Sequence, residues 1–186
     1  MTKILIVAAI ALAIPSVAAS ADDGLVTKPS RHSVEETIDS FEAAINAQAA
    51  GGWVVFGRID HAAAAKKAGL DMRPRTVIIF GNPKAGTPPM TRSATLAIDL
   101  PMKALVWQDD QDRVWLTYNT SEYNAKYVFP RHGVATSGDV SKALETFLTK
   151  VTTRALNDSC LAPCIAPEVE DSEHGFNRWA YRHGRN

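Results

Sequence analysis

Two histidine-containing pairs are the residues of this chain best suited, by type, to chemistry near neutral pH. Asp60 and His61 stand where a strand-like run ends and an alanine-rich run begins. A neutral imidazole at a helix N-terminus could transfer a proton or bind a metal. The alternative role is structural, in which Asp60 caps the helix and His61 lies half-buried beside it. Arg131 and His132 could bring a guanidinium and a second imidazole to the same end of the sheet.

A second candidate is the stretch FGNPKAGTPPM, residues 80–90, which follows the apolar run TVIIF. A phosphate-binding P-loop has the pattern G-x-x-x-x-G-K-[ST]. Gly81 and Gly86 have the required spacing, but Lys84 lies between them instead of following the second glycine. Because the lysine is misplaced for reaching the β- and γ-phosphates, the sequence does not predict nucleotide-phosphate binding.

The prolines of this stretch also argue against a phosphate site. Pro83 removes an amide donor that a phosphate cradle would use, and Pro88 and Pro89 are expected to prevent a helix from continuing. The structural interpretation is a turn at the exit of a strand. The functional interpretation is a loop that lines a pocket there, with Asn82 and Lys84 as its polar groups.

One hypothesis about a site joins these residues. It places the side chains of Asp60, His61, Asn82 and Arg131 in a common pocket suited to a small anion or a metal, although no set of metal ligands is assigned. The chain has no G-x-S-x-G or H-E-x-x-H motif and no cysteine beside a histidine. An exposed hairpin turn explains the acidic run at 108–112 better than paired catalytic carboxylates do. Catalysis and any cofactor therefore stay unassigned.

Cys160 and Cys164 are the two cysteines of the chain. On a helix, this spacing brings both side chains to one face, within reach of a disulfide. An even number of cysteines in an oxidising compartment usually indicates such a bond, so a disulfide is predicted. The alternatives are a redox or copper-binding pair, for which His174 is an available partner, and two free thiols.

The first 21 residues have the features of a secretory signal. Lys3 gives a positive charge, an apolar run follows at 4–14, and small residues at 19–21 allow cleavage after Ala21. The apolar run is shorter than the roughly 20 residues of a membrane-spanning helix. The sequence therefore predicts a periplasmic or secreted protein with no membrane span after signal removal. The formal net charge is 0, so bulk charge gives no indication of nucleic-acid binding.

Strand-like and helix-like patterns alternate along the rest of the chain. Strands are expected where β-branched and aromatic residues cluster, at 25–28, 53–60, 75–81, 103–107 and 114–118. Helices are expected at 34–50, 61–69, 91–99, 121–129 and 140–156. Ser33 and Glu36 form a capping box before the first helix. Trp107 and Trp115 flank the predicted hairpin turn and are expected to pack as a pair.

This order of elements predicts a single α+β domain with a largely antiparallel sheet and helices packed on one face, because two hairpin strands follow a helix. A small α/β sheet is the alternative. We assign the domain to residues 22–136, a C-terminal helix to 137–156, and a tail with the cysteine pair to 157–186.

Several blocks between about Gly24 and about Gly133 resemble the domain of unknown function 302 family. The most specific blocks are Asp60-His61, Arg73-Pro74, GNPKAGT at 81–87, Asp99-Leu100-Pro101 and Val106-Trp107. The resemblance implies a TBP-like fold of order β-α-β(4)-α, commonly dimeric, and no established activity. Arg131-His132 match the end of the family's domain, whereas Pro130 departs from its pattern. The tail from Ser137 onward lies outside the resemblance.

The sequence as a whole favours an exported, non-catalytic module that binds a small ligand or a partner, as a homodimer. One alternative is an enzyme of unknown class that uses His61. Another is a redox or copper-handling protein that acts through Cys160 and Cys164.

Overall fold

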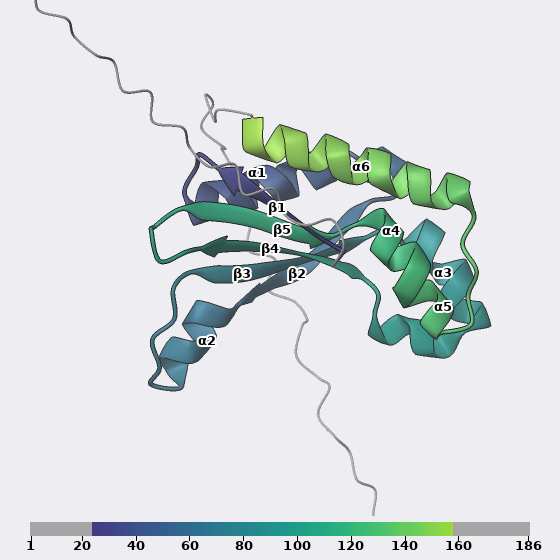
Figure 1. The fold of residues 1–186 in the computed structure, drawn as a ribbon, viewed down its shortest axis with the longest axis horizontal. Coiled ribbons are helices and arrows are strands. Elements are labelled where there is room, and N and C mark those ends of the chain that lie inside the picture. Colours follow the sequence, from purple (N-terminus) through teal and green to yellow (C-terminus); the bar gives the residue numbers. More distant parts are fainter. Residues whose placement is uncertain (1–23, 158–186) are drawn as a thin grey trace, which may run out of the picture.

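The computed structural model describes residues 24–157, which form a five-stranded sheet covered by two long helices (Figure 1). The strands are β1 (Leu25–Ser30), β2 (Val54–Asp60), β3 (Arg75–Gly81), β4 (Met102–Gln108) and β5 (Val114–Asn119). Their order in the sheet is β1-β5-β4-β3-β2, and each neighbouring pair is antiparallel. The predicted α+β class is confirmed. The predicted signal at 1–21 and both cysteines, Cys160 and Cys164, lie outside the described residues.

One face of the sheet carries the core. Ile78 and Phe80 of β3 are fully buried, as are Val106 of β4 and Leu116 of β5. These residues are spaced by two within each strand, and successive strand residues point to opposite faces, so the apolar set lies on one side. The ring of Phe80 meets Phe41 edge-on, with 5.4 Å between ring centroids, which joins this face to the helices above it.

Two amphipathic helices, α1 (Val34–Asn46) and α6 (Gly138–Asn157), cover this face side by side (Figure 1). The predicted capping box begins α1. The Ser33 hydroxyl accepts a hydrogen bond from the Glu36 amide at 3.2 Å, and the Glu36 carboxylate accepts one from the Ser33 amide at 2.9 Å. The inner faces of both helices contribute to the core, through Ile38, Phe41 and Ile45 of α1 and Phe147, Leu148 and Val151 of α6.

The short helices gather at the two ends of the sheet. At one end, called here the hairpin end, α2 (His61–Lys67) joins β2 to β3 near the β4–β5 turn. The opposite end, the α3 end, holds α3 (Pro83–Arg92), the 3-10 helix η2 (Ala94–Ile98), α4 (Ser121–Tyr123), the π-helical η3 (Asn124–Val128) and α5 (Phe129–Arg131). A 3-10 turn, η1 (Ala49–Gly51), precedes β2.

Helix α3 corrects the prediction that Pro88 and Pro89 prevent a helix. Both prolines lie inside the helix, and each lacks the amide that would bond to the carbonyl four residues earlier. Those carbonyls belong to Lys84 and Ala85, which are exposed, so water can satisfy them. Pro83 at the first helical position adds no cost, because its amide would have no helical partner there.

Three other boundaries differ from the predicted ones. The helix expected at 91–99 is absent, because α3 ends at Arg92 and the 3-10 helix η2 follows. The helix expected at 121–129 runs through Pro130 to Arg131 as three segments. Helix α1 ends at Asn46, earlier than the glycine pair that was expected to close it.

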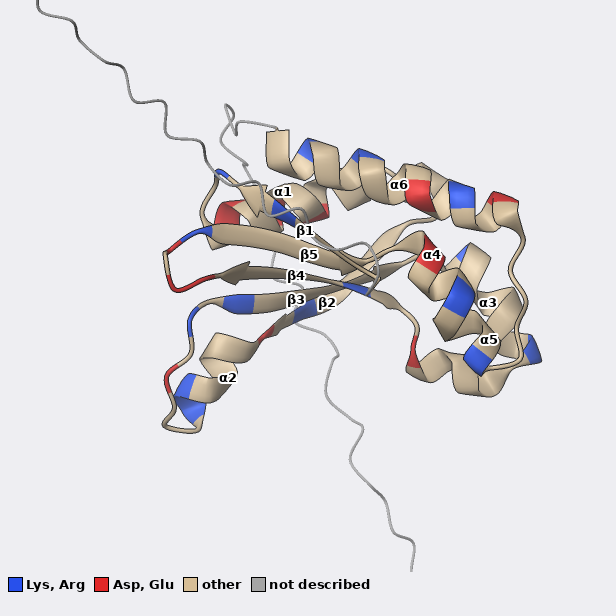
Figure 2. Cartoon of the chain, in the orientation of Figure 1, with Lys and Arg blue, Asp and Glu red and all other residues tan. Residues whose placement is uncertain are grey.

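Charged side chains mark the outer surface of the molecule. Figure 2 shows Lys, Arg, Asp and Glu along α6 and around the β4–β5 turn. Among residues 24–157, no helix has both the length and the apolar character needed to cross a membrane.

Candidate functional site

The antiparallel register separates the residues that the sequence hypothesis placed in one pocket. Asp60 at the end of β2 pairs with Thr76, and Val54 at its beginning pairs with Gly81. The end of β2 and the end of β3 are therefore at opposite ends of the sheet, so His61 follows one end and Asn82 follows the other. The expected convergence of His61 with Asn82 and Arg131 is wrong.

Asp60 and His61 lie at the hairpin end, where Asp60 has a structural role. The Asp60 carboxylate accepts a hydrogen bond from the Ala63 amide at 2.9 Å, which confirms that it caps α2. His61 is exposed at the first turn of this helix instead of half-buried. Within the described part of the chain, no group of three His, Cys, Asp or Glu residues is placed to hold a metal ion.

Asn82 lies at the α3 end and holds two segments together. Its side-chain oxygen accepts a hydrogen bond from the Ala85 amide at 3.2 Å and caps α3, and its amide donates to the Gly51 carbonyl at 2.9 Å. Gly52 adopts a φ of +89° beside it, and a Cβ there would lie 2.9 Å from the Asn82 oxygen. Only glycine fits this position. The Lys84 side chain passes on the same side, 3.3 Å from that Cβ position.

Arg131 and His132 do meet a carboxylate, that of Asp99. The imidazole of His132 is only 5% exposed; its Nε2 lies 2.7 Å from Asp99 Oδ2 and its Nδ1 lies 3.0 Å from Thr95 Oγ1. Arg131 Nη1 lies 3.3 Å from the same carboxylate oxygen. The hydrogen bond with His132, with help from the charge of Arg131, lowers the pKa of Asp99 below its ordinary value.

This cluster ties the end of α5 to η2. Both ring nitrogens of His132 have partners, and Ser93 donates a further hydrogen bond to the His132 carbonyl at 2.8 Å. The imidazole therefore has no free nitrogen to offer a substrate, and its arrangement serves positioning. Sequence reasoning missed Thr95 and assigned no role to Asp99, although Asp99 belongs to one of the blocks that carry the family resemblance.

An apolar groove of about 1130 Å³ lies at the α3 end. We call it the α3–α6 groove. Most of its lining residues belong to four segments: helix α3, the stretch Leu100–Met102, the link at 134–137 and the first turns of α6. Trp53, directly before β2, and Phe56 within β2 add aromatic surface. The FGNPKAGTPPM stretch thus lines a hollow, but as a helix instead of a turn. Lys84 is not among the lining residues, whereas Asn82 is.

Large apolar side chains define the inner wall of the groove. Trp53 and Phe147 stack almost parallel, with ring centroids 3.4 Å apart and an angle of 6° between planes. Gly86 of α3 leaves room in front of Met90 and Leu100, because a Cβ at Gly86 would meet only their side chains, at 3.6 and 3.9 Å. Arg92 is the one charged residue among those that line the groove.

A smaller cavity of about 140 Å³ lies beside the Asp99 cluster, lined by Asp99, Tyr118, Asn124 and their neighbours. A water molecule occupies roughly 30 Å³ of liquid, so this cavity accommodates a few waters. It is too small for the drug-sized ligands that pockets of about 300–1,000 Å³ accept. The α3–α6 groove is therefore the candidate functional site.

The family model for "Domain of unknown function DUF302" matches residues 26–151. This chain belongs to the DUF302 family. The match of the DUF302 domain continues past Gly133, where the resemblance was expected to end, and includes most of α6. The structure explains this extension, because α6 supplies Phe147, Leu148 and Val151 to the core of the domain.

Curated relatives of this DUF302 chain carry the name of an ion channel. It is 44% identical over 145 residues to a protein of Brucella suis biovar 1 (strain 1330) named fluoride-specific ion channel FluC 1, covering 77% of this chain and 54% of that protein. The protein of the same name from Brucella abortus biovar 1 (strain 9-941) is also 44% identical, over 51% of its length. The chain thus spans about half the length of the curated relatives it matches.

A solved structure supports the DUF302 fold. It is an uncharacterized conserved DUF302 protein from Bacillus stearothermophilus, matched with a TM-score of 0.56 and 16% sequence identity. The match covers 71% of this chain and 98% of that one. At this identity, the likeness supports the fold alone.

Proposed function

We propose that this DUF302 protein is an exported, non-catalytic module that binds a small apolar molecule in the α3–α6 groove. The observation that carries the proposal is the groove itself, which has a volume of about 1130 Å³ and mostly apolar walls. Small-molecule sites are typically apolar clefts with a few polar groups. Leaving apolar surface exposed to water is unfavourable, so an apolar ligand that covers these walls is stabilised by removing them from water.

The polar groups around the groove favour binding over catalysis. Asn82 is engaged in capping α3, and the His132 imidazole is enclosed by Asp99 and Thr95. The Arg92 guanidinium supplies hydrogen-bond donors and no acceptor for a proton. His61, the leading catalytic candidate from the sequence, is at the opposite end of the sheet. The residues lining the groove therefore supply surface and one charge, without an acid/base pair.

A fluorescence titration tests this proposal. N-phenyl-1-naphthylamine is a neutral apolar dye that brightens in apolar surroundings, and the purified protein is expected to bind it saturably. Gly86→Phe places a ring in the groove without backbone strain, since Gly86 lacks a left-handed φ and a Cβ there has only ordinary contacts. This variant is expected to bind the dye at least about tenfold more weakly, because its ring occupies the ligand volume.

The matched control adds the same ring at the hairpin end. Ala64→Phe lies on an exposed position of α2 and is expected to leave dye binding unchanged. Absence of saturable binding to the unmodified protein, or equal weakening by both variants, would contradict the proposal.

The proposal includes export, a disulfide and a dimer. The support for export is the charged, apolar and small-residue pattern of 1–21, and the support for a Cys160–Cys164 disulfide is their spacing in an exported chain. Amino-terminal sequencing of the mature protein is expected to begin after Ala21. Its intact mass is expected to be lighter by two hydrogen atoms before reduction, and light scattering is expected to give twice the chain mass. Retention of residues 1–21 would contradict export, free thiols would contradict the disulfide, and a monomer would contradict the dimer.

The channel relatives support a second proposal, in which this chain acts beside a fluoride channel. Those relatives contain a segment like this chain and a further portion about as long, within one polypeptide. Segments joined in one protein commonly work at the same place, so the segment in this chain is proposed to act on a partner of the same kind. The role proposed for this segment is accessory to the channel portion.

Fluoride efflux tests the accessory role. Vesicles holding the Brucella suis relative without its matched segment are expected to release fluoride at an altered rate, and addition of this chain is expected to restore the original rate. A rate that neither deletion nor addition changes would rule out the role, while leaving the apolar-ligand proposal intact.

A further inference from the structure

The charge inside the α3–α6 groove indicates more about its ligand than its apolar walls do. Arg92, in the last turn of α3, is the single charged residue among the lining side chains. The polar lining groups other than Arg92 are Asn82, Thr136 and Ser137, all uncharged. A ligand that fills this groove therefore meets apolar surface along most of its length and one fixed positive charge.

Arg92 also differs from the arginines that have structural roles. Arg58 pairs with Glu42 at 2.6 Å, Arg73 with Asp112 at 2.6 Å, and Arg113 with Asp109 at 2.8 Å. The Arg92 side chain makes no ion pair or hydrogen bond with any residue in the described range 24–157. Within that range nothing engages the five N–H donors of its guanidinium, and the side chain is exposed.

We propose that the ligand of the groove is a long-chain amphiphile with one acidic head group, such as a fatty acid, whose carboxylate pairs with Arg92. This inference rests on the proposed function of the groove and names the class of its ligand. A guanidinium and a carboxylate match in shape and form two parallel charge-assisted hydrogen bonds. Arg92 is exposed, so this pair stays in contact with water and adds modestly to the binding that the apolar walls provide.

Because the whole chain has no formal net charge, selectivity for an acidic head group depends on the local charge in the groove. The formal net charge is 0, so long-range attraction does not draw every anion to the surface. Selectivity for an acidic head must then come from Arg92 itself. Amphiphiles of equal chain length and different heads should be distinguished by this one side chain.

Displacement of N-phenyl-1-naphthylamine by three twelve-carbon compounds tests the inference. Dodecanoate, dodecanol and dodecylamine share the apolar chain and differ in the charge of the head. The protein is expected to bind dodecanoate up to about fivefold more tightly than dodecanol, as one exposed ion pair would provide. Dodecylamine is expected to bind more weakly than dodecanol, because its ammonium is repelled by Arg92.

Substitution of Arg92 tests whether this residue causes the preference for dodecanoate over dodecanol. Arg92→Gln is expected to remove the difference in affinity between dodecanoate and dodecanol. Arg31→Gln removes the same charge from an exposed position between β1 and α1 and is expected to keep the full preference.

The outcomes distinguish this inference from the function on which it rests. Equal binding of dodecanoate and dodecanol, or a preference that survives Arg92→Gln, would overturn the acidic-head inference and leave apolar binding in place. Failure of all three compounds and of the dye to bind would overturn the proposed function, and the inference with it.

Discussion

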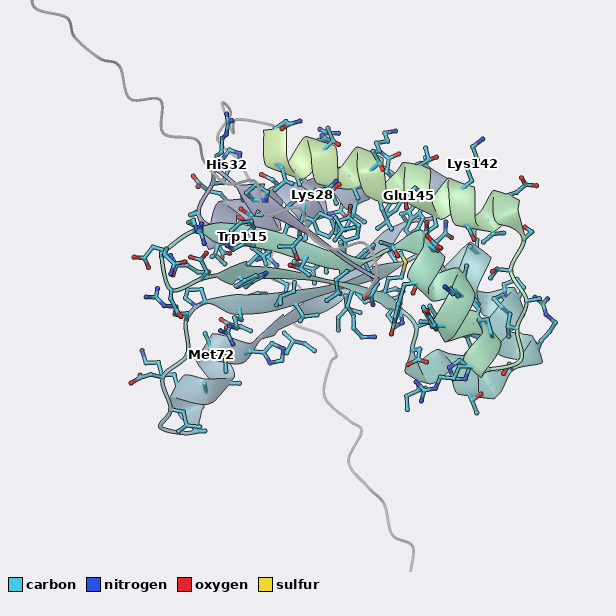
Figure 3. All side chains as sticks on the ribbon, in the orientation of Figure 1. Lys28, His32, Met72, Trp115, Lys142 and Glu145 are labelled. Atoms are coloured by element: carbon cyan, nitrogen blue, oxygen red, sulfur yellow. The ribbon has the colours of Figure 1, made fainter. Side chains whose placement is uncertain are left out.

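The two ends of the sheet use their side chains in opposite ways. At the hairpin end, charged residues form a network that holds a turn. Figure 3 places Met72 and Trp115 toward this end and Lys142 toward the other, where α6 begins over the groove. At the α3 end, apolar residues line an open groove that contains one charged side chain. At the hairpin end the polar side chains interact with one another, whereas at the α3 end an apolar surface is exposed and can bind a ligand.

Asp109 is the centre of the network at the hairpin end. Its carboxylate accepts hydrogen bonds from the amides of Gln111 and Arg113, from the Arg113 guanidinium at 2.8 Å and from the Trp115 indole at 2.9 Å. Burial favours its protonated form, but these hydrogen bonds together lower its pKa to about 2. The Asp109 carboxylate therefore orders the turn, and the hydrogen bonds that it accepts all come from groups of the protein itself.

Truncation of Phe147 is expected to have the largest effect, because this residue belongs to both the core and the groove. Phe147→Ala removes the ring that stacks on Trp53 and packs beside Phe80, and is expected to lower the free energy of unfolding by about 3–5 kcal/mol. Urea denaturation measures the loss. Leu70→Ala, at a 64% exposed position of the hairpin end, is the control and should change stability by less than about 0.5 kcal/mol. Similar losses in both variants would contradict the assignment of the core.

Loss of the His132 imidazole is expected to loosen the α3 end alone. His132→Ala leaves Asp99 and Thr95 without their shared partner and is expected to cost about 1–3 kcal/mol. Arg131→Gln removes an exposed partner of the same carboxylate and should cost at most about 1 kcal/mol. Hydrogen exchange should report faster opening of η2 and α5 in His132→Ala, with the β4–β5 hairpin unchanged. Faster exchange at the hairpin would show that the two ends are coupled.

Acid is expected to weaken the hairpin end through Asp109. Its pKa falls from 3.8 to about 2 on folding, so the native state binds fewer protons than the unfolded state between these values. The stabilisation is present above pH 3.8 and is lost as the pH falls through about 2. Urea denaturation of the unmodified protein and of Asp109→Asn across this range measures it. The variant should lose less stability on acidification, and parallel losses would contradict the role of Asp109.

The residues of the hairpin end that looked catalytic are expected to give the smallest effects. Asp60→Ala removes the cap of α2 and should cost about 1 kcal/mol. His61→Ala changes an exposed side chain and should alter stability by less than about 0.5 kcal/mol. Neither variant should change dye binding at the α3 end. A loss of binding in His61→Ala would restore this residue to the functional site.

Local patterns were sufficient to predict the strands, the two covering helices and the caps of α1 and α2 at their N-termini, but not the Asn82 cap of α3. The Ser33–Glu36 box and the Asp60 cap depend on residues three apart, and the pairing of Trp107 with Trp115 depends on one hairpin. Their confirmation follows from the short sequence separation over which these interactions act. The α+β class follows from the same patterns.

The site could not be predicted in this way, because it depends on register and on distant contacts. Whether His61 lies near Asn82 is decided by the antiparallel pairing of β2 with β3, which no single segment encodes. The contact of His132 with Asp99 spans 33 residues. The prolines of α3 misled because the carbonyls that they leave without a helical partner belong to Lys84 and Ala85, which are exposed, so water can replace the lost hydrogen bonds.

A chemical-shift map of the protein with dodecanoate tests the difference between the two ends most directly. We expect the backbone amide signals of α3, Leu100–Met102 and the first turns of α6 to shift as ligand is added. The signals of α2 and of the turn at 109–113 should stay in place. Shifts centred on the hairpin end, or an absence of shifts at the groove when ligand is in excess, would contradict the assignment of the α3–α6 groove as the functional site.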